Sequence, residues 1–213
     1  MWIKKLVMCF AVVALAGCID DDDDKKGAPQ EGDVERVVEE EAGLDGRWHS
    51  PLCEADGHGG SSILDIVVDG REWRMVLHSY AFDTDCHFKT STRETEHLVT
   101  EVGNEVLADG TAVVQYNALI TGVFLTFHEA TAASLHNDKA YCGNTDWEVG
   151  IQRDVSSCHA LWYGGPLALN STFYGVYSLQ YDFFYKGFIT QDMGLTPETR
   201  SDTLDYIGYF ERQ

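Results

Sequence analysis

Three side chains around Cys86 have the types and spacing that could hold a metal ion. Asp83, Asp85 and His87 alternate along the chain, so on an extended strand they would point to one face. Carboxylate and imidazole groups together can bind a divalent cation. A hairpin loop of solvated carboxylates explains the same pattern, and we favour that interpretation. We therefore expect no metal site and no cofactor.

Patterns typical of enzymes are weak in this chain. No serine sits in the Gly-x-Ser-x-Gly frame of a hydrolase nucleophile, and no second histidine completes a metalloprotease helix after His128-Glu129. Asp182, Asp192 and Asp205 could pair for acid–base chemistry, but a chain with 35 acidic residues produces such pairs by chance. We expect no catalytic residues, and a metal-dependent or acid–base enzyme is only the second alternative function.

Aromatic side chains are the better candidates for a binding role. The chain holds 10 phenylalanines, 10 tyrosines and 5 tryptophans, and they are dense between Phe173 and Phe188. Large rings either fill a small barrel completely or line a ligand cavity, with tyrosine hydroxyls as polar anchors. If a cavity exists, we expect the following side chains to bind the ligand: Trp73, Tyr174, Tyr177, Tyr181, Phe183 and Tyr185.

Residues 1–18 have the features of an export signal. Lys4 and Lys5 precede an apolar run from Leu6 to Ala14, and small residues follow it as far as Cys18. This order of charged, apolar and small residues is typical of a signal peptide. The apolar run is shorter than the roughly 20 residues of a transmembrane helix. A plain secretory signal is the other alternative.

The segment Leu15-Ala16-Gly17-Cys18 resembles the lipobox of bacterial lipoproteins. In that family a peptidase cuts before the cysteine, whose thiol takes a diacylglycerol and whose new amine is acylated. The resemblance implies a signal peptide over residues 1–17 and lipidation of Cys18. An aspartate after the cysteine retains enterobacterial lipoproteins in the inner membrane, and Ile19 stands there instead. By analogy we expect an outer-membrane protein that contacts the membrane through its lipid anchor.

The chain is strongly acidic, with 35 acidic and 15 basic residues and a formal net charge of −20. Binding of nucleic acid through its phosphates needs clustered lysines and arginines, so we exclude nucleic acid as a partner. Asp20 to Asp24 form a run of aspartates, which cannot pack against one another and stay solvated. We therefore predict an acidic, flexible tether over residues 18–45, extended by its own charge.

Four cysteines lie beyond the leader: Cys53, Cys86, Cys142 and Cys158. An even number in an exported protein predicts disulfides. Three pairings are possible, and we expect the sequential one, Cys53–Cys86 and Cys142–Cys158. Closing loops of this size stabilises a fold by about 3–4 kcal/mol each in the chain-entropy account.

From Trp48 onward the sequence has the pattern of β-strands. Ser61–Val68 and Glu72–Phe82 are rich in β-branched and aromatic residues. Asp69-Gly70 between them predicts a tight hairpin, and Asp109-Gly110 predicts a second one between 105–108 and 111–115. Val113–Phe127, interrupted by Gly122, is expected to form either one bent strand or two strands with a bulge. Further strands are expected at Asp146–Gln152, Phe173–Leu179, Phe183–Thr190 and Leu204–Phe210.

This pattern predicts one all-β domain over residues 46–213, with a short helix or a lid loop at 129–140. We expect a single antiparallel meander β-barrel of about 8–10 strands, because closure removes the exposed sheet edges. A β-sandwich is the alternative.

The opening Gly46-Arg47-Trp48-His49-Ser50 resembles that of lipocalin-like barrels. In that family a Gly-x-Trp begins the first strand and its tryptophan plugs the closed end of the barrel, a role that Trp48 would take. With Cys53 and Glu54 following, the opening also resembles the domain of the Wnt-inhibiting adenomatosis-polyposis-coli-down-regulated proteins, in which paired half-barrels bind a lipid. Cys53 and Cys86 match the first disulfide of that domain.

Together these expectations favour a non-catalytic lipoprotein whose lipocalin-like barrel binds a small apolar or amphipathic ligand or a lipid. The alternative is an envelope module with a solidly packed barrel whose loops contact another envelope protein. A cavity of a few hundred cubic ångströms, as ligand sites usually have, would favour the first.

Overall fold

The computed structural model of the protein describes residues 43–158, 169–188 and 194–213, and residues 41–213 belong to one compact unit. The expected leader and nearly all of the expected tether lie outside the described residues. The strands are β1 (Gly46–His49), β2 (Glu54–Ala55), β3 (Ser61–Asp69), β4 (Glu72–Tyr80), β5 (Ser91–Val106), β6 (Ala112–Phe127), β7 (Arg153–Asp154), β8 (Thr172–Gln180), β9 (Phe183–Lys186) and β10 (Phe210–Arg212). The helices are α1 (Ala130–Asp138) and the short 3-10 turns η1 (Tyr141–Gly143) and η3 (Pro197–Thr199).

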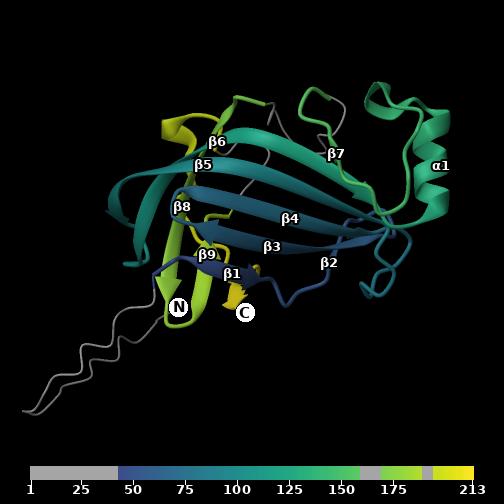
Figure 1. Cartoon of the computed structure of the whole chain (residues 1–213). Coiled ribbons are helices and arrows are strands. Elements are labelled where there is room, and N and C mark those ends of the chain that lie inside the picture. The colour runs from purple at the N-terminus through teal and green to yellow at the C-terminus, as the bar shows by residue number, and fades with distance from the viewer. Residues whose placement is uncertain (1–42, 159–168, 189–193) are drawn as a thin grey trace, which may run out of the picture. The chain divides into compact units, whose positions relative to one another are not determined.

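Eight of the strands close into an antiparallel barrel (Figure 1). Around the ring they follow the order β1, β10, β9, β8, β6, β5, β4 and β3, and the pairing of β1 with β3 closes it. The short strands β2 and β7 pair with β3 and β6. The predicted all-β barrel is confirmed, and the sandwich alternative does not apply.

Both predicted hairpins form, but the first turns one residue later than expected. Asp69 still pairs with Glu72, so the turn consists of Gly70 and Arg71, with Gly70 at φ 55°. In the second hairpin the backbone N–H of Gly110 donates to the carbonyl of Leu107 over 2.9 Å. Both glycines have positive φ, a conformation that residues with a Cβ rarely adopt.

Of the two alternatives for the long apolar run, a single strand forms, β6, and it contains a bulge. Glu96 pairs with Gly122 and His97 with Ile120, so Thr121 forms a bulge. The extra residue shifts the alternation of side chains along β6 by one position, so apolar side chains point into the barrel on both sides of the bulge. A Cβ on Gly122 would lie 2.9 Å from Cε2 of the Phe124 ring, so a larger residue there would force that ring to move.

Three predicted elements differ in the structure. Residues 146–152 form a loop rather than a strand, because the Trp147 side chain is buried and its backbone N–H donates to Asn137. At 204–210 only Leu204 makes an isolated bridge before β10 begins, since the Asp205 carboxylate accepts the N–H of Gly208 over 2.8 Å and forms a turn. Of the predicted strand Phe183–Thr190, residues 183–186 form β9, and 189–190 lie outside the described residues.

For residues 129–140 the helical alternative is the one that forms, as α1. Within the described ranges, no helix has both the length and the apolar character needed to cross a membrane.

The end of the barrel at which β1 begins, here called the Trp48 end, is filled with aromatic rings. Trp48 is fully buried, its ring centroid lies 5.7 Å from that of Phe184, and its Nε1 donates to the Leu44 carbonyl. The guanidinium of Arg212 covers the indole at 4.3 Å and donates to the Asp45 carbonyl over 2.7 Å. Arg212 thereby ties the last strand to the segment that enters the first.

The opposite end, here called the α1 end, carries both disulfides. Cys53 is bonded to Cys86 and Cys142 to Cys158, so the sequential pairing is confirmed. The first disulfide links the loops that flank β2 and follow β4, and the second holds the segment after α1. Long loops at this end are therefore covalently tied.

We predict that Trp48→Ala will lower the free energy of unfolding by about 3–5 kcal/mol, because it removes a fully buried indole. Urea unfolding followed by circular dichroism measures the change. Tyr181→Ala is the matched control, since Tyr181 is 99% exposed and its removal should change stability by less than about 0.5 kcal/mol. Equal losses in the two variants would contradict the role given to Trp48.

Candidate functional site

The inner face of β4, β5 and β6 is organised in rows across the strands. Pairing places Leu77, Arg93 and Leu125 in one row. The next row toward the α1 end holds Ser79, Ser91 and Phe127. Side chains two residues apart on a strand share a face, and the same face carries Trp73 of the aromatic core, so both rows point into the barrel.

A cavity of about 450 Å³ lies between these two rows and helix α1. Its lining also includes the loop after β4, the helix and η1, and it consists of Leu77, Ser79, Ala81, Phe82, Thr90, Ser91, Arg93, Leu125, Phe127, Glu129, Thr131, Ala132, Leu135, His136 and Tyr141. Phe82 is 95% exposed and marks the rim, where the cavity meets solvent. Most of this lining is apolar or hydroxylic.

Helix α1 is fixed over the cavity by aromatic contacts. The His136 ring lies 4.3 Å from Phe127 and 4.7 Å from Tyr141, measured between centroids. Its Nδ1 donates to the Ala132 carbonyl over 2.7 Å. Trp147, in turn, packs edge-on against Phe127 at 4.9 Å. The helix is therefore part of the folded wall of the cavity.

Arg93 is the cationic group of the lining. Burial lowers the pKa of its guanidinium, and the nearby Tyr141 acts in the opposite direction. A charge removed from water in this way is costly unless other groups compensate it. Arg93 stands in the row between Leu77 and Leu125, so a charged side chain lies between two apolar ones in this site.

The six side chains predicted to bind a ligand do not lie together. Trp73 and Tyr177 are buried in the aromatic core, 5.7 Å apart between ring centroids, and the Tyr177 hydroxyl donates to Glu101. Burial, followed by this contact with Glu101, raises the pKa of Tyr177. Tyr181 is exposed in the turn between β8 and β9.

The other three lie on the outer faces of β8 and β9. Tyr174 packs under the Arg200 guanidinium at 5.2 Å, while Phe183 and Tyr185 contact Tyr209 at 5.3 Å and 6.4 Å. None of the six lines the cavity under α1. The aromatic side chains between Phe173 and Phe188 thus pack on both faces of the barrel wall.

Some residues of the cavity were missed because β5 was predicted only at its end, within 105–108, and not over the part that lines the cavity. Its first half, Ser91–Val99, is polar at nearly every position, so the alternation of faces is hidden. The one signal in this segment was the charged residue Arg93. It stands on the same face of β5 as Thr95, His97 and Val99, and the structure shows these three to be buried.

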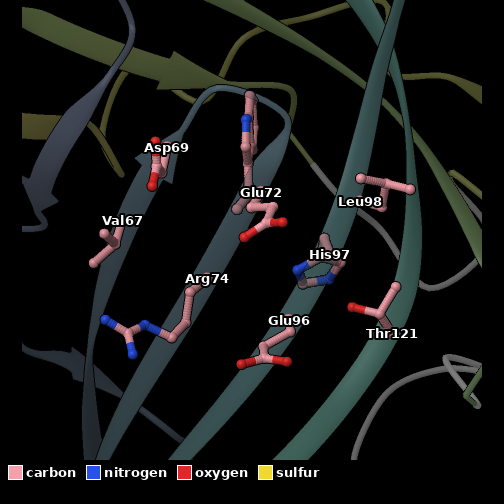
Figure 2. Close-up of a pocket in the computed structure, with 9 residues that line it drawn as sticks. Val67, Asp69, Glu72, Arg74, Glu96, His97, Leu98 and Thr121 are labelled. Carbon is pink, nitrogen blue, oxygen red and sulfur yellow. The ribbon is translucent and has the colours of Figure 1, made fainter.

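A larger hollow of about 520 Å³ lies on the outer face of β3–β6 (Figure 2). Figure 2 shows Glu72, Arg74 and Glu96 projecting from neighbouring strands around it. Its charged side chains are exposed and make a polar groove between ridges of a twisted sheet. We regard the inner cavity as the better candidate, because its lining is less polar than that of the outer hollow.

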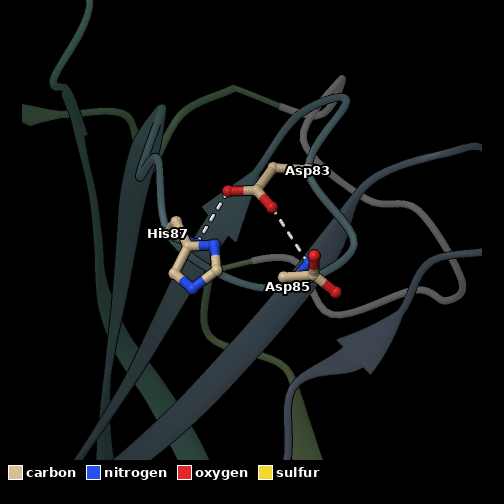
Figure 3. Close-up of side chains that lie close together, drawn as sticks. All are labelled: Asp83, Asp85 and His87. Atoms are coloured by element: carbon tan, nitrogen blue, oxygen red, sulfur yellow. Dashed lines mark hydrogen bonds between the residues drawn. The ribbon is translucent and has the colours of Figure 1, made fainter.

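The possible metal ligands Asp83, Asp85 and His87 come within 4.8 Å of one another (Figure 3). The Asp83 carboxylate, however, accepts the backbone N–H groups of Phe88, His87 and Asp85 over 2.6, 2.7 and 2.9 Å. These bonds, that from Phe88 first, lower the pKa of Asp83. Its contacts are those of a residue that shapes a loop, and a cation would compete with them for the same oxygens.

The carboxylates considered for acid–base chemistry are also separated. Asp182 is exposed in the β8–β9 turn, and Asp205 accepts backbone N–H groups in its own loop. Asp192 lies outside the described residues. The available geometry gives no pair that could work together.

A hydrogen-bonded array crosses the outer face of the barrel instead. His49 and His78 lie 2.6 Å and 3.4 Å from the Asp65 carboxylate, and Thr92 joins His78 to His128. Burial opposes ionisation of Asp65, but the bonds from His78 and His49 outweigh it and leave the pKa below its ordinary value. The array ties neighbouring strands together.

His97 is a histidine buried inside the barrel. It is 8% exposed, and its Nδ1 has no hydrogen-bond partner among the described residues. Its cross-strand partners, Trp73 and Ile120, carry no charge. Burial lowers the pKa of His97 to about 4, from an ordinary value of about 6.5.

We predict that His97 makes the protein less stable as the pH falls. The unfolded chain binds a proton below about pH 6.5 and the folded chain only below about pH 4, so stability is lost between those values. From about pH 7.5 to about pH 5 the loss due to this residue is ~2 kcal/mol. Urea unfolding at both pH values should show that His97→Leu removes this loss, whereas the exposed loop variant His58→Gln keeps it. Parallel pH profiles for wild type and His97→Leu would refute the prediction.

Comparison of the sequence with protein-family models and with curated proteins gave no match, so the functional argument rests on the cavity and its lining.

Proposed function

We propose that the protein binds a small apolar or amphipathic molecule, or a lipid, in the cavity between the inner face of β4–β6 and helix α1. The observation that carries the proposal is the cavity itself, about 450 Å³ and reached from a solvent-exposed rim. Ligand sites in proteins commonly have this size and a mainly apolar lining with a few polar groups. Leu77, Leu125 and Phe127 supply the apolar surface, and the serines beside them supply hydroxyls.

The contrast between the two ends of the barrel supports this proposal. At the Trp48 end the interior is filled by packed rings, among them Trp48, Trp73 and Phe184. At the α1 end the inward positions include Ser79 and Ser91, which are neighbours on β4 and β5. Their side chains are too small to fill the interior there. A fold that needed only a core would be more stable with larger apolar residues there.

We predict that the protein purified from cells carries a bound small molecule, detectable by native mass spectrometry of the full chain with Cys18→Ser. Ala132→Phe should abolish the adduct, because it adds a ring to the wall of the cavity. Ser134→Phe is the matched control, since Ser134 is exposed on the same helix and does not line the cavity. If no adduct is present and no added amphiphile binds, the proposal fails.

A second candidate function is docking of another envelope protein. Phe82 and Phe88 are 95% and 72% exposed on the loop that the Cys53–Cys86 disulfide closes. Exposed apolar side chains close together are typical of interaction surfaces. Loss of partner cross-linking in a Phe88→Ser variant, with ligand binding intact, would favour this candidate, because Phe88 does not line the cavity.

We also propose that the protein is a lipoprotein of the outer membrane, anchored through Cys18. The support comes from the sequence: the charged and apolar leader and the segment Leu15-Ala16-Gly17-Cys18. Several buried acyl chains, at about 0.8 kcal/mol for each CH₂ group, hold a protein on a bilayer almost permanently. The acidic segment after Cys18 would then act as a tether.

We predict that Cys18→Ser will move the protein from the membrane fraction to the soluble fraction of the periplasm. Immunoblots of separated inner and outer membranes provide the measurement. Cys9→Ser is the matched control, because Cys9 lies within the apolar run of the leader and its loss should leave the protein in the membrane. Membrane fractionation of the Cys18→Ser variant would contradict lipidation.

A further inference from the structure

The position of Arg93 along the barrel axis makes it the floor of the cavity. The row that it shares with Leu77 and Leu125 is the innermost row of the lining. The following row, which includes Thr95 and Val123, does not line the cavity and closes it from below. A molecule that enters past the rim at Phe82 therefore meets the guanidinium last.

The polarity of the cavity is arranged in the same direction. Near the mouth the wall is formed by Phe82, Phe127 and Leu135, and these offer contact to an apolar chain. At the floor, Arg93 stands between two leucines. An apolar ligand would gain nothing from the charge, whereas an anion would gain a charge-assisted hydrogen bond.

Arg93 also has a contact of its own within the protein. A guanidinium carries five N–H donors in a planar fork, a geometry that can serve more than one partner at a time. The lining supplies one carboxylate, Glu129, which precedes α1 at the mouth. The fork at the floor is thus suited to a planar or tetrahedral anion that arrives from the cavity.

We infer that the ligand is an amphiphile with an anionic head group, which binds head-first so that its carboxylate or phosphate contacts Arg93. Its apolar chain would lie between β4–β6 and α1 and extend toward the rim. This inference rests on the proposed function, because it specifies the ligand of the same cavity.

A second inward-facing cation gives the experiment its control. Lys186 shares the inner face of β9 with the buried Phe184, and its Nζ lies 4.9 Å from the centroid of the Phe210 ring. It does not line the cavity. Removing Lys186 changes the net charge of the chain as much as removing Arg93 does, but should leave the head-group site intact.

The test is isothermal titration calorimetry of the full chain with Cys18→Ser, after extraction of any bound molecule. The probes are dodecanoate, dodecyl phosphate, dodecanol and dodecyltrimethylammonium, each below its micellar concentration. We expect at least one anion to bind about 10- to 100-fold more tightly than the alcohol, the range given by a charge-assisted hydrogen bond. The cation should bind more weakly than the alcohol.

Three variants locate the preference. Arg93→Met should remove the advantage of the anion over the alcohol, and Arg93→Lys should keep part of it, because the charge remains without the fork. Lys186→Met should retain the full preference. The circular dichroism spectrum of each variant reports whether it folds, and the comparison of probes on the wild-type site stands even where a variant does not.

The outcomes separate this inference from the proposed function. If the alcohol binds as tightly as both anions, the cavity binds ligands but the anionic head group is refuted. If the preference survives Arg93→Met in a folded protein, or is lost in Lys186→Met, Arg93 is not its origin. If none of the probes binds, the proposed function and this inference both fail. A preference for one anion over the other identifies the head group as carboxylate or phosphate.

Discussion

The whole barrel depends on one four-residue strand. Strand β1 pairs with β3 along its length and with β10 at Trp48 and His49, and among the strands that the structure describes no other joins the two ends of the ring. The partner of Trp48 on β10 is Arg212, whose guanidinium also covers the indole. Because these contacts join the beginning and the end of the domain, the barrel cannot close until nearly all of the chain is in place. Closure of such distant segments is entropically costly, which makes a large buried ring at this junction physically useful.

The same closure explains why a cavity occurs at one end. Strands β1, β9 and β10 are short, and they contribute Trp48, Phe184 and Phe210 to the aromatic core at the Trp48 end. Strands β3 to β6 continue past this core toward α1 (Figure 1), with Ser79 and Ser91 facing inward beside Arg93. Here the wall is completed by α1 and by the segment that the second disulfide holds. The cavity is thus the space between the inner face of β4–β6 and helix α1, beyond the aromatic core.

The sequence predicted those features that depend on local chemistry. Glycine turns marked both hairpins, the long apolar run marked β6, and the even number of cysteines indicated two disulfides, whose sequential pairing formed. The prediction of strands from the sequence was wrong where a tertiary contact determined the local structure. Trp147 sits in a segment of suitable composition for a strand, yet its burial against Phe127 makes that segment a loop. The first half of β5 was missed for the opposite reason, because polar residues such as Thr95 and His97 occupy inward positions where the alternating pattern of a strand leads one to expect apolar residues.

The inward face of β5 carries polar residues both in the packed core and in the cavity. Trp73, His97 and Ile120 form a row in which the imidazole is buried and kept neutral by its surroundings. Toward α1, on the same face of β5, Arg93 has an open space before it, and a guanidinium stays charged at any physiological pH. In a chain of net charge −20, carboxylates repel an approaching anion at the surface, so only contact with an inward cation can reverse that repulsion. An acidic exterior and a cationic floor together would admit an anion only when its apolar chain also gains from entering the cavity.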